Sequence, residues 1–369
     1  MSILKFDHIK SNFYKFNSYQ IFFLSILICI LFYSLEGIVG VDRFYHPDSA
    51  HYLTKYENYN LESYIKNPLK IFSLTYYHIT NLFGDNYYLL ILLNFILYSL
   101  SNVFIYQKVF KRYFDVLSNL KLVFLFYLLF LDPYRLHLAS HILKETFLIF
   151  FMIILVLSNI KIIKILSVLI LETFRPNSWI YALIFFKYSN LIKFIKTIKK
   201  IFEIKLIYQI LAPIILLLIV FFIIKDQFFY DLIETEFEKF IKKIKYFDNK
   251  QMPLRTFDQV AQFKDFDFPV GFILKNISWP IILLSGFFTF FVSSILFKFL
   301  GIIIIINNVL VYKISKKSFI SLGLIIILLM ISVYTSSYTA MFRYSYIALY
   351  SSLVYFFLKL DLKNCKRDD

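Results

Sequence analysis

The sequence predicts an all-α, polytopic membrane protein, and three observations carry this prediction. Hydrophobic residues make up 59% of the chain and charged residues only 17%, below the roughly 25% of ordinary soluble domains. Apolar runs of helical length follow one another along the sequence. The lysines sort to the loops of one side. We therefore expect a single integral membrane domain, residues 1–369, with about 10 transmembrane helices (8–12) at roughly 20 residues each.

The first predicted span covers residues 19–40 and follows a tail with three lysines, of which Lys15 is the last. This basic tail favours a cytoplasmic N-terminus. No small-residue cleavage site follows the run, which continues into Glu36 and Asp42. We therefore expect a retained signal-anchor helix.

The remaining apolar runs predict the other crossings. They cover residues 86–106, 119–132, 141–159, 162–174, 177–188, 206–224, 296–312, 318–337 and 343–358. The two short runs on either side of Arg175 and Pro176 predict a broken hairpin.

Charge assigns the two sides of the membrane. The heaviest cluster of lysines lies between residues 187 and 205, whereas the two long loops 41–85 and 225–280 are nearly neutral. Both termini are then cytoplasmic and the two long loops extracytoplasmic. The net charge of +16 thus sets topology, and no nucleic-acid partner is expected.

The outer loops are amphipathic. Apolar residues recur at helical spacing among acidic and basic ones in the second loop, namely at Phe229, Ile233, Phe237, Phe240, Ile244 and Phe247. Residues 69–83 show a similar pattern. We expect in-plane helices that lie on the membrane surface and bind lipid.

Composition excludes several functions. Seven glycines and two cysteines leave no glycine-rich phosphate loop, no disulfide framework and no thiolate metal site. Polar residues instead collect on the extracytoplasmic side. Five of the six histidines are His46, His51, His78, His137 and His141, and the arginines there are Arg43, Arg135, Arg175, Arg255 and Arg343. Because the guanidinium fork suits phosphate and carboxylate, this placement indicates an anionic ligand at the outer face.

Several segments resemble one family. Pro47-Asp48-Ser49, with Tyr52 following, comes directly after the first span and resembles the acidic first-loop motif of GT-C integral-membrane glycosyltransferases, in particular the protein-mannosyltransferase-like branch. Similar segments follow in order: Leu82-Phe83-Gly84, with Asn94 in the next helix, then Asp132-Pro133, Ser140 to Thr146, Phe174-Arg175-Pro176 and Phe342 to Ser345. An acidic pair is frequent in this motif, whereas here Asp48 is followed by Ser49.

The resemblance implies a GT-C-like fold and transfer of a sugar from a polyprenyl-phosphate donor to a glycan, lipid or protein acceptor. Asp48 is then the catalytic base, and Arg175 and Arg343, with Arg43 or Lys144, contact the donor phosphate. Transfer chemistry needs such a carboxylate for the acceptor proton and cations for the departing phosphate. A bacterial inner membrane is the favoured location.

Each assignment has an ordinary alternative. Asp48 is also suited to capping a helix, and Lys144 to a lipid headgroup. Arg175 and Arg343 could extend to headgroups, and Arg175 could pair with Glu172.

The histidines are expected to line a wet cavity together with Glu145. His137, His141 and Glu145 recur every four residues, so a helix through them would align them on one face. His46 and His51 lie in the first loop. We assign no metal site and no obligate cofactor, although a divalent metal on the aligned residues is the alternative.

Two other functions fit the same sequence. A polysaccharide polymerase or ligase also joins lipid-linked glycans at the outer face. A non-enzymatic lipid-linked oligosaccharide flippase or transporter would instead have ionisable residues along a path near the middle of the bilayer.

Overall fold

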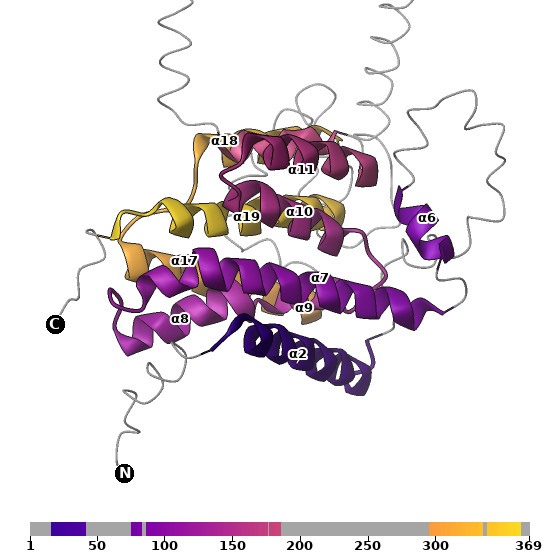
Figure 1. Cartoon of the computed structure of the whole chain (residues 1–369), viewed down its shortest axis with the longest axis horizontal. Coiled ribbons are helices and arrows are strands. Elements are labelled where there is room, and N and C mark those ends of the chain that lie inside the picture. The colour runs from indigo at the N-terminus through magenta and orange to yellow at the C-terminus, as the bar shows by residue number, and fades with distance from the viewer. Residues whose placement is uncertain are drawn as a thin grey trace, which may run out of the picture.

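The computed structural model describes residues 16–41, 75–82, 86–175, 177–185, 295–334 and 338–362. Within these ranges the chain is helical and contains no strand. Figure 1 shows the long helices stacked in layers with their axes running broadly side by side. Most of the predicted loops 41–85 and 225–280, and the predicted span 206–224, lie outside the described residues.

The first predicted span is a helix, α2 (Ser18–Ile38). Its N-terminus has a capping box, in which the Asn17 side chain accepts from the Gln20 backbone N–H at 2.8 Å and Gln20 accepts in return at 2.9 Å. Gly40 ends it with φ +80°. The Gly40 and Val41 N–H groups reach back to the carbonyls of Gly37 and Glu36, the pattern of a left-handed helix end.

The next region forms two long helical segments. One comprises α7 (Tyr87–Lys108) and a short 3₁₀ turn, η2 (Phe110–Tyr113). The other comprises α8 (Asn119–Phe130) and α9 (Pro133–Ala139). Asp132 separates α8 from α9 by capping α9, with its side chain accepting from the Tyr134 and Arg135 N–H groups at 3.0 and 3.1 Å.

Apart from α6 (Thr75–Leu82), which lies in the predicted amphipathic segment 69–83, the remaining described helices overlap the other apolar runs. They are α10 (Glu145–Leu157), α11 (Lys161–Phe174), the 3₁₀ segment η3 (Ser178–Phe185), α17 (Ile295–Ser315), α18 (Leu322–Tyr334) and α19 (Tyr338–Lys359). The break between α11 and η3 agrees with the predicted broken hairpin at Arg175-Pro176.

The core centres on α10, which packs against α7, α9, α11 and α19. Most of its side chains are buried, including Leu148, Met152 and Ile153. Helix α6, in the predicted first outer loop, leans on this core because the Tyr76 ring meets Phe147 at 5.5 Å, edge to face.

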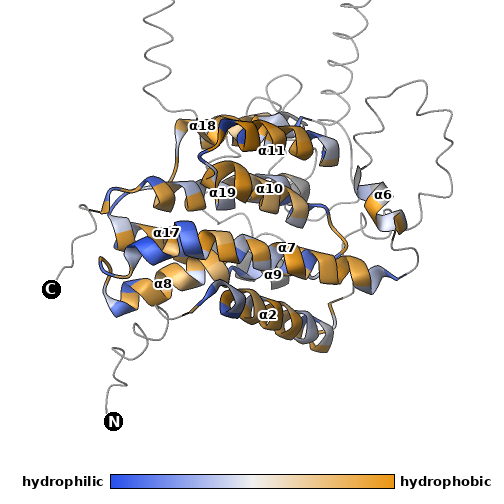
Figure 2. Ribbon diagram, viewed as in Figure 1, coloured by the Kyte–Doolittle hydropathy of each residue, from blue (hydrophilic) through white to orange (hydrophobic). Residues whose placement is uncertain are grey.

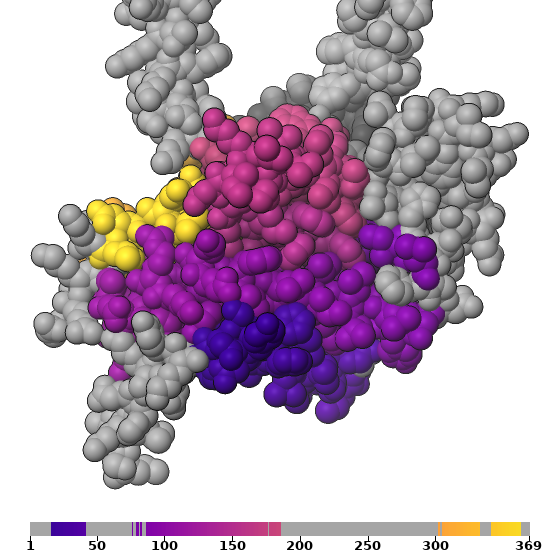
Figure 3. Space-filling view, viewed as in Figure 1, coloured from indigo at the N-terminus to yellow at the C-terminus, as the bar shows by residue number. Residues whose placement is uncertain are grey.

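The helices are largely hydrophobic, with shorter hydrophilic stretches (Figure 2), and many of their large apolar side chains are exposed. Helix α2 lies at the edge against α7 (Figure 3), and on it Phe23, Leu27, Leu31 and Leu35 are each more than half exposed. Among the residues that the structure describes, three helical segments are long and apolar enough to cross a membrane, namely Ser18–Ile38, Tyr87–Tyr113 and Asn119–Ala139. An apolar exterior of this kind suits lipid.

One segment was not predicted as a helix. The residues between the runs 119–132 and 141–159 form α9, and its residues 134–139 are buried in the bundle. Its capping by Asp132 and its apolar neighbours explain this, because a short helix with satisfied ends can be buried where an open loop cannot.

Candidate functional site

Two buried polar clusters lie around the start of α10. In the first, Glu145 opens α10 and Arg343 extends from α19. The Arg343 Nε lies 3.1 Å from Glu145 Oε1, and the two side chains are 11% and 1% exposed. A guanidinium and a carboxylate from helices distant in sequence are thus held together inside the bundle.

Arg175 adds a second guanidinium to this cluster. Because proline disfavours helical geometry in the residue before it, Arg175 is extended (φ −155°, ψ 119°) and ends α11. Its guanidinium lies over the Tyr344 ring, 3.1 Å from the centroid. Tyr181 donates a hydrogen bond to the Tyr344 carbonyl at 3.1 Å and ties η3 to α19.

The cluster of Arg175, Arg343 and Glu145 carries an excess of positive charge. Arg343 pairs with Glu145, and Arg175 lies near enough to interact electrostatically with both. The buried Arg175 Nη1 has no hydrogen-bond acceptor among the residues that the structure describes. Glu172 does not pair with Arg175, since its carboxylate accepts from the Asn177 and Trp179 N–H groups at 2.6 and 3.2 Å. Such a cluster can accept an anion with several oxygens.

The second cluster joins Glu36 of α2 to two histidines. His137 Nδ1 lies 2.6 Å from Glu36 Oε1, and His141 Nδ1 lies 2.8 Å from the His137 carbonyl. The two imidazole rings are 4.3 Å apart. All three side chains are buried.

Glu145 does not lie on one helix face with His137 and His141, although the three residues recur every four positions in the sequence. Helix α9 ends at Ala139 and α10 begins at Glu145, so no single helix carries His137, His141 and Glu145. Glu145 instead pairs with Arg343, and Glu36 takes its place beside the histidines. Glu36 is the one acidic or basic residue in α2, and a charge within an apolar span is itself a signal of function.

Arg135, grouped with the outer arginines in the sequence, is held by the protein itself. Its guanidinium donates to Asn102 Oδ1 at 2.6 Å, to the Tyr350 hydroxyl at 2.7 Å and to the Tyr98 carbonyl at 3.1 Å. It also lies over the Tyr98 ring, 4.1 Å from the centroid. Arg135 therefore fastens α7, α9 and α19 together and is not available to a ligand.

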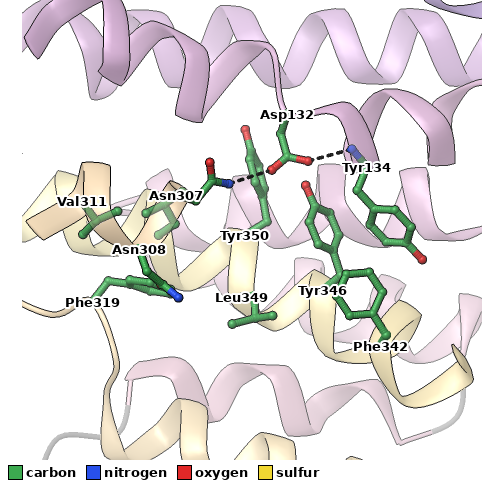
Figure 4. Close-up of a pocket in the computed structure, with 11 residues that line it drawn as sticks. Asp132, Tyr134, Asn307, Asn308, Val311, Phe319, Phe342, Tyr346, Leu349 and Tyr350 are labelled. Carbon is green, nitrogen blue, oxygen red and sulfur yellow. Dashed lines mark hydrogen bonds between the residues drawn. The ribbon is translucent and has the colours of Figure 1, made fainter. Parts of the chain in front are cut away.

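A small cavity of about 60 Å³ lies beside Asp132, between α9, α17 and α19. Asn307 donates to Asp132 Oδ2 at 3.5 Å, and the Tyr346 hydroxyl points toward the same carboxylate (Figure 4). The rest of its lining is mainly apolar and includes Val311, Phe342, Leu349 and Leu353. A few water molecules would fill this volume. His137, His141 and Glu145 do not line it.

The other predicted site residues divide into two groups. Lys144 lies directly before α10, partly buried, and its carbonyl accepts from Leu148 N–H at 3.1 Å. Asp48, Arg43, His46 and His51 lie outside the described residues, and their assignments stay predictions.

Comparison with known proteins finds no similar protein. No family model matches the chain, and no curated protein or solved structure is significantly similar to it.

Proposed function

We propose that this protein is a multi-pass membrane glycosyltransferase of GT-C type that uses a polyprenyl-phosphate-linked sugar donor. One observation carries the proposal. Three segments that resemble the family in sequence, around Glu145, Arg175 and Arg343, come from α10, the end of α11 and α19 and meet in one buried, positively charged cluster. The convergence of these three segments on one cluster supports treating them as parts of a single site.

The chemistry follows from charge. The oxygen of an acceptor hydroxyl attacks the anomeric carbon of the donor sugar, and the bond from that carbon to the phosphate oxygen breaks. The phosphate leaves with the electron pair, and Asp48 takes the hydroxyl proton. Arg175 and Arg343 stabilise the charge that develops on the departing phosphate, where fixed cations in a dry site act most strongly.

Glu145 has a distinct part in this proposal. Its carboxylate neutralises Arg343 while no donor is bound, so that two buried guanidinium groups need not face each other alone. A phosphate that reaches the cluster would then compete with Glu145 for Arg343. The site would favour ligands with at least two negative oxygens, which can engage both arginines.

The proposed topology has about ten crossings, both termini in the cytoplasm and the site at the extracytoplasmic side, in keeping with roughly 20 residues per span and the distribution of lysine. The donor would enter from the lipid bilayer, and the acceptor from outside. A bacterial inner membrane provides both.

The test is comparative mass spectrometry of cell-surface glycans at matched membrane abundance. Asp48→Asn, Arg175→Met and Arg343→Met should each remove or strongly reduce one sugar. Arg112→Met is the control, because Arg112 is exposed and donates to the Leu358 carbonyl away from the cluster. Unchanged glycans in the Asp48→Asn strain would remove Asp48 as the base.

The same samples separate the rival functions. Loss of a ladder of repeat units would indicate a polymerase or ligase instead of a single-sugar transferase. Accumulation of complete lipid-linked glycan on the cytoplasmic side would indicate a flippase.

A further inference from the structure

The cluster of Glu36, His137 and His141 has the composition of a metal site. Each residue offers one ligand atom, and the three atoms all lie within 4.8 Å of one another. The relative exposures are 6% for Glu36 and 1% for each histidine. The ligands come from α2, α9 and the turn after α9, so the packing of separate elements brings them together.

His141 is oriented as a metal-ligating histidine is. A carbonyl only accepts hydrogen bonds, so the 2.8 Å contact of His141 Nδ1 with the His137 carbonyl places the proton on Nδ1. The lone pair of His141 is then on Nε2. Ligating histidines commonly have the second ring nitrogen fixed by a backbone carbonyl or a carboxylate in this way.

Neighbouring side chains hold this arrangement in place. Asn94 donates to the His141 carbonyl at 2.8 Å, and the Tyr134 ring stacks on His137 with the centroids 5.9 Å apart. Asn94 is fully buried in α7. The histidines are therefore set against α7 as well as α2, which limits the rotamers that they can adopt.

We propose that Glu36, His137 and His141 bind one divalent transition-metal ion, with Zn²⁺ as the preferred ion. Two imidazoles and one carboxylate are a ligand set that suits zinc, whereas Mg²⁺ and Ca²⁺ favour oxygen ligands alone. Three protein ligands leave a fourth, tetrahedral position for water or another small ligand. The proposal does not depend on the transferase function.

The three ligand atoms lie near the spacing that zinc requires, since none is more than 4.8 Å from another. Zinc bonds of about 2.0–2.2 Å at a tetrahedral angle place ligand atoms about 3.4 Å apart. The distance of 2.6 Å between Glu36 Oε1 and His137 Nδ1 would have to open by less than about 1 Å, which side-chain torsions can provide. The ion would replace the proton that Glu36 and His137 share.

Metal analysis of the full-length chain tests the proposal. The protein carries a tag without histidine and is purified in detergent, stripped with a chelator and titrated with Zn²⁺. We expect about one equivalent of zinc per chain. Glu36→Gln, His137→Asn and His141→Asn should each weaken zinc binding by about 100-fold or more, because loss even of groups behind the ligands costs about 10–100-fold.

Two matched variants serve as controls. Glu145→Gln removes a buried carboxylate that pairs with Arg343 instead, and His78→Gln removes a histidine of α6. Both should bind zinc as the wild type does. Co²⁺ in place of zinc should give the strong visible absorption of a tetrahedral site in the wild type, and this signal should be lost in the His141→Asn variant.

The proposal fails if stripped, folded wild-type protein takes up no stoichiometric zinc or cobalt. That result would leave Glu36 and His137 as a hydrogen-bonded pair alone, and it requires no variant to fold. Equal zinc affinity in the three ligand variants and the two controls would also overturn it.

Discussion

Arg135 and Arg175 are both arginines of the bundle interior, but the structure assigns them opposite roles, and substitution by methionine should separate them. Arg135 donates hydrogen bonds to Asn102 Oδ1, the Tyr350 hydroxyl and the Tyr98 carbonyl. Among the described residues, the Arg175 guanidinium lies over the Tyr344 ring and its Nη1 has no hydrogen-bond acceptor. Methionine keeps much of the apolar length and removes the charge from either position.

The expected magnitudes follow from these contacts. Arg135→Met loses two hydrogen bonds from the guanidinium to side chains, each worth roughly 1.5–3 kcal/mol for a charged donor. Part of this loss in stability is recovered because the variant no longer has to bury a charge. We expect Arg135→Met to lower the free energy of unfolding by about 3 kcal/mol. Arg175→Met loses one cation–π contact, worth about 1 kcal/mol.

Each variant is fused to a fluorescent protein, solubilised in detergent and heated. Fluorescence-detected size-exclusion chromatography then measures the fraction that remains folded at each temperature. At about 2 °C per kcal/mol, Arg135→Met should lower Tm by about 6 °C and Arg175→Met by about 2 °C. Arg112→Met, on the exposed surface, serves as the reference. Equal shifts for Arg135→Met and Arg175→Met would refute the division between a structural and a ligand-binding arginine.

Three further predictions concern the ion pair, the end of α2 and topology. Arg343→Met removes the cation that pairs directly with the buried Glu145 carboxylate, so we expect a loss of about 3 kcal/mol. The double variant with Glu145→Gln should largely recover this loss, and strictly additive Tm shifts in the four proteins would contradict the coupling. Gly40→Ala should cost about 1 kcal/mol because residue 40 has φ +80°, whereas Gly37→Ala inside α2 should be neutral or stabilising. The same melting assay checks both glycine variants, and a stabilising effect of Gly40→Ala would contradict the left-handed helix end. In a chain without native cysteines, Val41→Cys should react with a membrane-impermeant maleimide on intact cells, and reaction only after lysis would invert the proposed topology.

The sequence by itself predicted most of the helices that the structure describes. Helices α2, α7, α10, α11 and α17 start and end within a few residues of their apolar runs, because hydrophobic length and helix-ending residues are local properties. The break at Arg175-Pro176 was predicted for the same reason. The count of about ten crossings and the roles of Asp48 and its loop rest on residues outside the described part.

Tertiary structure decided which polar side chains meet. Glu36 and His137 are 101 positions apart, and no periodicity in the sequence relates them. The four-residue spacing predicted that Glu145 lies beside the histidines. In the structure the turn before α10 separates them, and Glu145 pairs with Arg343 of α19. Spacing along one helix predicts neighbours only while that helix continues. Buried charges, by contrast, are matched across the bundle, because each must find its partner wherever packing places one.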